Sequence, residues 1–170
     1  MNLFIVSGAP NTGKSTTVYH LCTYLLNLGY VKTDIPYNGK RYSTSTSFPP
    51  ILANDFSCLL EKEGKKVLIH TATDDVFNID ALVNSINNHK PSIVITTCRD
   101  FGDWPRDYFC SQLKLVNSFI LASTSDIDIE EFPLSRITRR TTRFATAYEW
   151  YFINSTHQIE KILSSPPYTI

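Results

Sequence analysis

The sequence lacks an excess of charge of either sign, and it lacks any long uninterrupted apolar run. Its 16 basic residues balance its 16 acidic residues, so no overall field would draw the protein to nucleic acid or to an anionic membrane. No apolar stretch approaches the roughly 20 residues that cross a bilayer, and the first residues do not resemble a secretory signal. We therefore expect a cytoplasmic protein without a membrane partner, in which any site for a polyanion is local.

Cysteine and histidine are both scarce, and neither forms a metal-binding pattern. The four cysteines are far apart and include no C-x-x-C pair, which disfavours a zinc knuckle or a thioredoxin-like motif. We expect reduced thiols, mostly buried in apolar segments. The four histidines also lack ligand spacing, so we expect structural or surface roles for them. These residues are Cys22, Cys58, Cys98, Cys110, His20, His70, His89 and His157.

Apolar side chains are plentiful, since 42% of the 170 residues are hydrophobic. A chain of this length can bury one core but is short for two, so residues 1–170 are expected to form a single domain. Short apolar runs, typical of buried strands, alternate with apolar residues spaced by three and four, typical of helices. This alternation predicts an α/β fold with a mostly parallel sheet and helices on both faces.

The periodicity assigns most of the chain to individual elements. A pattern over 135–163 predicts one more helix, broken near Asn154 and Ser155, and residues 30–50 are expected to form a loop or irregular hairpin that is a candidate for substrate contact. Residues 55–73 allow a helix followed by a strand, or an antiparallel hairpin that turns at Glu63 and Gly64; alternating apolar positions favour the hairpin. The other predicted strands are 2–7, 92–98 and 118–122, and the other predicted helices are 14–28, 79–89 and 106–113.

One segment, Gly8-Ala9-Pro10-Asn11-Thr12-Gly13-Lys14-Ser15, separates the first predicted strand from the first predicted helix. It fits G-x-x-x-x-G-K-[ST] at every defined position, and it has the strand-before, helix-after setting that this pattern requires. The motif resembles the phosphate-binding loop of the P-loop nucleoside triphosphatases, and the chain is most similar to their small kinase-like members. The resemblance implies a three-layer P-loop NTPase fold that binds Mg²⁺ and ATP.

Physical chemistry explains the residue types in this loop. Glycines permit backbone conformations in which successive N–H groups surround an anion, and the positive end of the following helix adds to the attraction. The resemblance implies that Lys14 contacts the β- and γ-phosphates, that Ser15 binds Mg²⁺ and that Thr16 reaches the α-phosphate. The candidate nucleotide-binding residues are Gly8, Asn11, Thr12, Gly13, Lys14, Ser15 and Thr16.

A magnesium site of this kind also requires a carboxylate at the end of a neighbouring strand. Asp74 and Asp75 follow the segment 67–73, several residues after its apolar core, and Asp100 follows a later predicted strand. We favour Asp74, and after it Asp75, as the metal ligand beside Ser15, because the strand before them is expected to neighbour the first strand. The alternative is that these acidic residues are solvated in a loop or cap a helix.

Arginines are candidates for neutralising the charge of a transferring phosphoryl group. Arg99 ends a predicted strand, and Arg140 lies in a basic segment that also contains Arg136, Arg139 and Arg143. In the nucleotide and nucleoside kinases that the chain resembles, lid arginines close over the phosphates. The alternative is a solvated basic face that forms surface ion pairs with the acidic residues at 126–131. The candidate catalytic residues are Lys14, Asp74, Arg99 and Arg140.

Motifs that are missing narrow the class of protein. The sequence contains no guanine-reading N-K-x-D and no D-x-x-G, which disfavours a Ras-like GTPase. The resemblance therefore predicts a Mg²⁺-ATP-dependent ATPase or small phosphotransferase that acts on an unidentified small-molecule or protein acceptor. One alternative is a nucleotide-dependent regulatory switch with little or no catalysis. A nucleic-acid-dependent phosphotransferase is a further, less favoured alternative.

Overall fold

The computed structural model describes residues 1–36, 55–115, 128–134 and 145–170, with the backbone alone described for 128 and 145–152. These ranges contain six strands and four helices. The strands are β1 (Asn2–Ser7), β2 (Val31–Asp34), β3 (Ser57–Lys62), β4 (Lys65–His70), β5 (Ile93–Cys98) and β6 (Asp128–Pro133). The helices are α1 (Lys14–Asn27), α2 (Val76–His89), α3 (Arg106–Gln112) and α4 (Ala145–Leu163).

The described strands form one mixed sheet in the order β2-β3-β4-β5-β1-β6. β1 is parallel to both of its neighbours, β5 and β6, and β4 is parallel to β5. β3 is antiparallel to β2 and to β4, and the β3–β4 turn contains Glu63 and Gly64, both with positive φ. The predicted hairpin is therefore confirmed, and the alternative of a helix followed by a strand is wrong.

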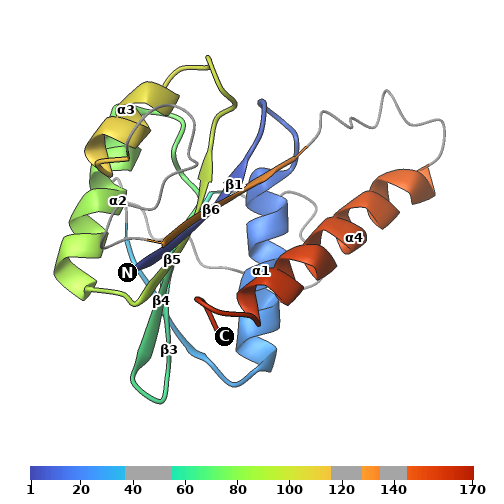
Figure 1. Cartoon of the computed structure of the whole chain (residues 1–170), viewed down its shortest axis with the longest axis horizontal. Helices are drawn as coiled ribbons and strands as arrows, with labels where there is room; N and C mark the ends of the chain where they lie inside the picture. Colours follow the sequence, from blue (N-terminus) through green and yellow to red (C-terminus); the bar gives the residue numbers. More distant parts are fainter. Residues whose placement is uncertain (37–54, 116–127, 135–144) are drawn as a thin grey trace.

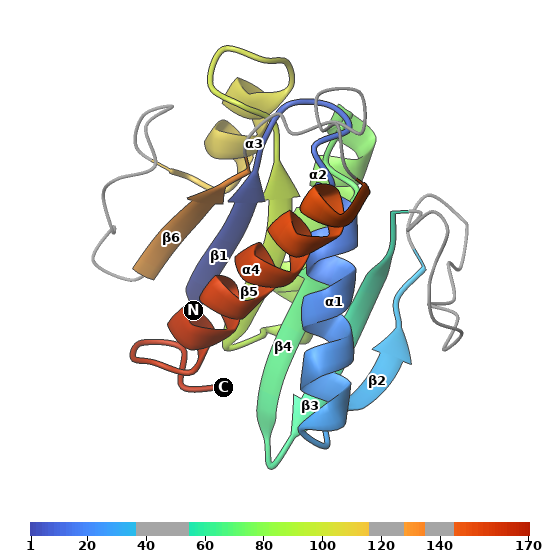
Figure 2. The same cartoon turned by 90° about the vertical axis from the view of Figure 1, so that its right-hand side faces the viewer.

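Helices cover both faces of the sheet, with α1 and α4 on one face and α2 and α3 on the other (Figures 1 and 2). Successive residues of β1 point to opposite faces, so Phe4 packs in the core beneath α1 and α4, whereas Leu3 and Ile5 pack in the core beneath α2 and α3. A central parallel strand buried on both sides is apolar throughout. This explains the continuous apolar run with which the sequence begins.

Several boundaries differ from the prediction. α2 begins at Val76, earlier than predicted, and α4 continues through Asn154 and Ser155, so the predicted break is wrong. β2 lies within the segment predicted to be a loop or irregular hairpin, and β6 was not predicted at all. The strand predicted at 118–122 lies outside the described residues, as do the start of the last predicted helix, 135–144, and most of the predicted loop, 37–50.

β6 escaped prediction because its sequence, Asp-Ile-Glu-Glu-Phe-Pro, is rich in acidic residues. It lies at the end of the sheet order, beside β1. An edge strand requires one partner only, and charged side chains there protect the free edge from pairing with another chain. Three of the acidic residues expected to form surface ion pairs, Asp128, Glu130 and Glu131, thus belong to a strand, and Asp126 lies outside the described residues.

Candidate functional site

The segment that joins β1 to α1 lies at the carboxyl ends of the parallel strands (Figure 2). β1 continues into α1 on one face of the sheet, whereas its neighbour β5 continues towards α3 on the other face. In open α/β sheets a crevice forms where the connections of two adjacent strands leave to opposite faces, and ligands bind there. The candidate residues near Gly8 and Arg99 therefore meet at the position where this fold favours a ligand.

The loop from Gly8 to Gly13 is compact. Its start is held from both sides, because Gly8 N donates to Cys98 O of β5 (3.2 Å) and Leu134 N donates to Ser7 O (2.8 Å). A Cβ at Gly8 would lie 2.6 Å from Thr12 Oγ1, so this position has no room for a side chain. Gly13 has a φ of 89°, which glycine adopts without strain.

Thr12 closes the loop on itself. Its hydroxyl donates to Ala9 O at 2.9 Å, and its amide approaches the same oxygen at 3.4 Å. Asn11 just before it has a positive φ of 62°. Alternation of left- and right-handed backbone conformations turns successive N–H groups to one side of a loop, which makes a concave anion site. The sequence-predicted residues Asn11, Thr12 and Gly13 are thus brought together in one turn.

Lys14, the first residue of α1, folds back over this loop. Its Nζ donates to Gly8 O (2.8 Å) and Ala9 O (3.0 Å), and the residue is only 8% exposed. No described side chain caps α1, so the positive end of this helix is free to face a ligand. Burial lowers the pKa of Lys14, and the charge of Arg99 lowers it further, while Asp74 and Asp100 oppose the shift.

Asp55 is a functional candidate that sequence reasoning missed. It accepts a hydrogen bond from Ser15 Oγ at 2.7 Å, and Thr71 Oγ1 lies 3.3 Å from the same carboxylate oxygen. Because β3 is antiparallel to β4, the residues before β3 lie at the edge where the parallel strands end. The hairpin was predicted, so an acidic residue just before its first strand was the available signal.

The electrostatic state of Asp55 follows from this position. Burial of its carboxyl raises the pKa of Asp55, and the negative charge of Asp74 raises it as well. The hydrogen bonds from Ser15 and Thr71 and the charge of Lys14 act in the opposite direction. A cation bound beside this carboxylate would favour its ionised form.

Asp74 occupies a different place from the one expected. It follows β4, and β4 is separated from β1 by β5, so the expectation that its strand neighbours the first strand is wrong. The carboxylate of Asp74 accepts a hydrogen bond from Arg99 Nε at 2.8 Å, and its side chain is 51% exposed. Asp75 accepts from Asn78 N at 2.8 Å and caps α2, which confirms for Asp75 the alternative of a helix cap.

Threonine hydroxyls fix the ends of β4 and β5 against each other. Thr73 Oγ1 donates to Thr97 O at 3.0 Å, and Thr97 Oγ1 donates to Thr71 O at 2.7 Å. All three residues are buried, so these bonds are shielded from water. They hold the chain just before Asp74 and just before Arg99, and so they set the position of that ion pair.

Arg106 anchors the segment that follows β5. The guanidinium of this α3 residue donates to both carboxylate oxygens of Glu131 in β6, at 2.9 and 2.7 Å, and to Arg99 O at 2.8 Å. Arg106 is 3% exposed, and such a two-pronged bond fixes orientation as well as distance. Glu131 therefore pairs with Arg106.

The predicted candidate Arg140, like the other arginines of its segment, lies outside the described residues.

The oxygen atoms around Ser15 suit a magnesium ion better than a transition metal. Within the ranges that the structure describes, no three His, Cys, Asp or Glu side chains form a metal-binding group. A hydroxyl and a carboxylate do lie together, at Ser15 and Asp55. Mg²⁺ in nucleotide sites takes one or two protein oxygens and fills its other positions with phosphate oxygens and water. The residues present fit that requirement.

Comparisons with protein-family models, with curated proteins and with solved structures found no match to this chain. No relative therefore supplies a family or a function. Among the helices of the described ranges, none combines the length and the apolar character needed to cross a membrane.

Proposed function

We propose that the chain binds a nucleoside triphosphate with Mg²⁺ at the loop 8–13 and is a P-loop ATPase or small phosphotransferase. The observation that carries this proposal is the position of Lys14. Its buried ammonium lies across the loop on two main-chain carbonyls, at the start of a helix with no described side-chain cap. Phosphate oxygens can replace those carbonyls as acceptors, and the desolvated site strengthens their attraction to the ammonium.

The loop would bind the phosphates, and the residues around it would bind Mg²⁺. Main-chain N–H groups and Lys14 bind the phosphates, and the Ser15 hydroxyl and Asp55 carboxylate would hold Mg²⁺. When bound, Mg²⁺ neutralises charge on the phosphates. Asp55 takes the role that the sequence assigned to Asp74, because Ser15 donates to Asp55 and Asp74 pairs with Arg99.

Arg99 is the described arginine best placed to neutralise developing charge. It lies near enough to Lys14 for its charge to lower the pKa of that ammonium. Asp74 and the main-chain bond from Arg106 orient it. The roles of Thr16 at the α-phosphate and of Arg140 as a lid arginine stay predictions from the resemblance.

The test is nucleotide binding and ADP release with matched lysine variants. ATP with Mg²⁺ should raise the melting temperature of the protein, because a ligand that binds only the folded form stabilises it by mass action. Lys14→Ala removes an ammonium that contacts phosphate and should weaken binding roughly a hundredfold. Lys66→Ala, at the opposite edge of the sheet, should leave binding unchanged. Equal affinity and equal ADP release in Lys14→Ala and the unaltered protein would remove the proposal.

Turnover separates the enzyme from the regulatory switch. A phosphotransferase or ATPase releases ADP at a rate that depends on Lys14 and, for a transferase, on the acceptor supplied. Saturable binding with no ADP release in the presence of any acceptor would instead favour the switch. Binding to nucleic acid with a constant that falls steeply as the salt concentration rises would favour the nucleic-acid-dependent alternative.

A further inference from the structure

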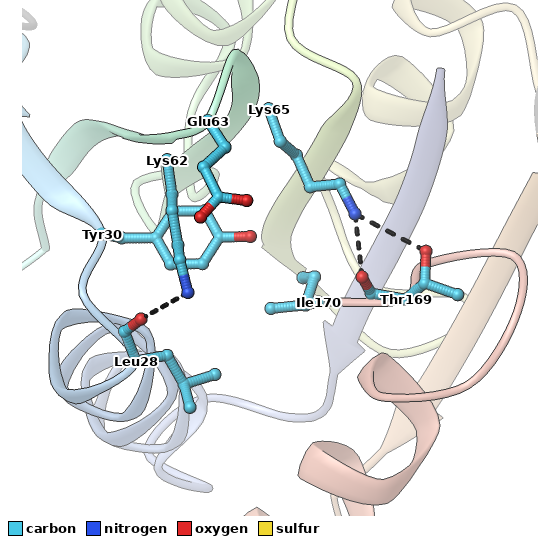
Figure 3. Close-up of a pocket in the computed structure, with 7 residues that line it drawn as sticks. All are labelled: Leu28, Tyr30, Lys62, Glu63, Lys65, Thr169 and Ile170. Carbon is cyan, nitrogen blue, oxygen red and sulfur yellow. Dashed lines mark hydrogen bonds between the residues drawn. The ribbon is translucent and has the colours of Figure 1, made fainter.

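A pocket lies at the other edge of the sheet, where the end of α1, the β3–β4 turn and the C-terminal segment meet (Figure 3). The pocket has a volume of about 330 Å³. β4 begins there and runs parallel to β5 and hence to β1, and Asn2 at the start of β1 donates to Pro167 O. The pocket therefore lies a full strand length from the loop 8–13. Its volume falls at the small end of the range for ligand sites, about 300–1,000 Å³.

Two lysines define the polar sides of this pocket (Figure 3). Lys62 Nζ donates to Leu28 O at 2.8 Å and lies 5.9 Å from the centre of the Tyr30 ring. Lys65 Nζ donates to Thr169 O at 2.8 Å and makes longer contacts with Tyr168 O (3.4 Å) and Thr169 Oγ1 (3.5 Å). Within the described part of the chain, neither ammonium forms an ion pair with a carboxylate. An ammonium has three N–H donors, so Lys62 keeps donors for a ligand.

The remaining walls are largely apolar. Leu28, Ile170 and the Tyr30 ring also line the pocket, with the Tyr30 hydroxyl directed towards it (Figure 3). Burial raises the pKa of Tyr30, and the nearby charge of Glu63 raises it further, so the phenol stays a neutral donor at physiological pH. Two of the lining side chains, those of Lys62 and Lys65, carry ammonium groups, and one, that of Glu63, carries a carboxylate.

We propose that this pocket binds a small organic carboxylate, with its negative group between Lys62 and Lys65 and its apolar body against Leu28 and Ile170. The two ammonium groups attract the carboxylate, whereas a dianion such as a phosphate monoester loses more hydration than a monoanion for each added unit of attraction. Main-chain carbonyls already hold both ammonium groups in place, so a ligand pays little to order them. This site does not depend on nucleotide binding at the loop 8–13.

Benzoate and its neutral amide, benzamide, test the proposal directly. A titration followed by amide chemical shifts should show saturable benzoate binding, with the largest shifts at residues 28–30, 62–65 and 168–170. Benzamide should bind about tenfold more weakly, since it has no negative charge to pair with the two ammonium groups. Phenyl phosphate should also bind more weakly than benzoate; tighter binding of phenyl phosphate would overturn the assignment of a carboxylate.

Matched variants locate the site. Lys62→Gln and Lys65→Gln should each weaken benzoate binding about tenfold, whereas Lys66→Gln, whose side chain points to the other face of β4, should leave it unchanged. Leu28→Trp fills the pocket without removing charge, and it should block binding even if a lysine variant folds poorly. No saturable binding of benzoate, or equal losses in Lys66→Gln and Lys65→Gln, would overturn the proposal.

Lys14→Ala separates this proposal from the nucleotide site. Benzoate binding should survive in that variant, because the pocket and the loop lie at opposite edges. Loss of benzoate binding in Lys14→Ala would show that the anion enters the loop 8–13, and it would overturn the pocket. Loss of nucleotide binding with benzoate binding retained would support the two sites as independent.

Discussion

The parallel strands of the sheet end on one side, here called the carboxyl edge, and begin on the opposite side, here called the amino edge. Positively charged side chains have different surroundings at these two edges. At the carboxyl edge, Lys14 and Arg106 are buried, and Arg106 is locked to a carboxylate. At the amino edge, Lys62 and Lys65 are partly exposed and donate to main-chain carbonyls. Coulombic interactions strengthen as water is excluded, but burial of an unpaired charge is costly. The charged side chains at the carboxyl edge therefore interact strongly, and the fold depends on their partners. Those at the amino edge interact weakly because water screens them, so their substitution should cost less stability.

Topology explains why the buried charges gather at one edge. At the carboxyl edge, the connections after β1 and β5 leave to opposite faces, so the loops separate and leave room between them. At the amino edge, β3 and β4 are joined by a tight turn at Glu63 and Gly64. The following predictions test whether the two edges differ as much in energy as they do in structure.

The largest effect is expected from Arg106→Ala, which leaves the carboxylate of Glu131 without its partner. Removal of one member of a buried ion pair typically costs about 3–5 kcal/mol. Urea denaturation should show a loss of this size in the free energy of unfolding. Lys62→Ala at the amino edge should cost less than about 1 kcal/mol, as exposed polar contacts do.

A double variant controls for the origin of that loss. Arg106→Leu combined with Glu131→Leu removes both charges and should recover much of the stability lost in Arg106→Ala, because well-packed apolar side chains can replace a buried pair. A cost in Arg106→Ala no greater than that in Lys62→Ala would break the contrast between the edges.

The next largest effect is a pH dependence from His70 at the carboxyl end of β4. Burial lowers the pKa of His70 from 6.5 to about 4. Its ring lies between Ser57 Oγ (3.1 Å) and Ala72 O (2.8 Å), a pattern that suits the neutral ring with a proton on Nε2. Between these two pKa values His70 is protonated in the unfolded chain but neutral in the folded chain. The free energy of unfolding therefore falls as the pH drops from 6.5 towards 4.

The loss attributable to His70 should reach about 3 kcal/mol at the acidic end of this window. Unfolding measured by urea at several pH values gives its size. His70→Gln should flatten the profile, whereas His157→Gln, in which the exposed ring of α4 is replaced, should keep the slope of the unaltered protein. A slope that survives in His70→Gln would assign the acid sensitivity to carboxylates.

Local sequence patterns were sufficient for one part of the fold. The loop from Gly8 to Gly13 was predicted from its motif, and the strands on either side of the crevice and the hairpin were predicted from apolar patterns and turn residues. All of these signals involve neighbours in sequence. α4 shows the limit of local preference. Asn154 and Ser155 disfavour a helix, but the helix continues through them, because Ile159 and Leu163 on its next turns pack in the core.

Side-chain contacts between residues far apart in the sequence could not be predicted from sequence patterns. Ser15 and Asp55 are 40 positions apart, and Arg106 and Glu131 are 25 apart. Each pairing depends on the strand order, which places β5 between β4 and β1 and adds β6 on the other side of β1. The assignment of Asp74 rested on a different order of strands. The backbone geometry of a motif thus depends on its own residues, whereas the other members of a candidate site depend on the order of the strands.

A smaller effect is expected from Asp55→Asn. This substitution should weaken nucleotide binding but should not lower the stability of the fold. The amide oxygen of asparagine can still accept from Ser15, but its loss of charge should weaken Mg²⁺-dependent nucleotide binding about tenfold. Because the folded state raises the pKa of Asp55, ionisation of this group opposes folding as the pH rises above its usual value of 3.8. Asp55→Asn should therefore be at least as stable as the unaltered protein at neutral pH.

Calorimetric titration of ATP with and without Mg²⁺, paired with urea denaturation, measures both effects on the same sample. Weaker binding accompanied by a clear loss of stability would indicate that Asp55 supports the fold and has no special role towards the metal. Binding that is weakened equally with and without Mg²⁺ would also contradict the assignment.

The smallest effect is expected from Asp74→Asn, which breaks the half-exposed ion pair with Arg99. Such a pair contributes at most about 1 kcal/mol, and the difference from the unaltered protein should shrink further in high salt. Mg²⁺ should still strengthen ATP binding in this variant, because Ser15 and Asp55 remain. The comparison of Asp74→Asn with Asp55→Asn decides which carboxylate serves the metal. If Asp74→Asn alone abolished the effect of Mg²⁺, the ligand would be the aspartate that the sequence favoured, and closure of the site would have to bring Asp74 to Ser15.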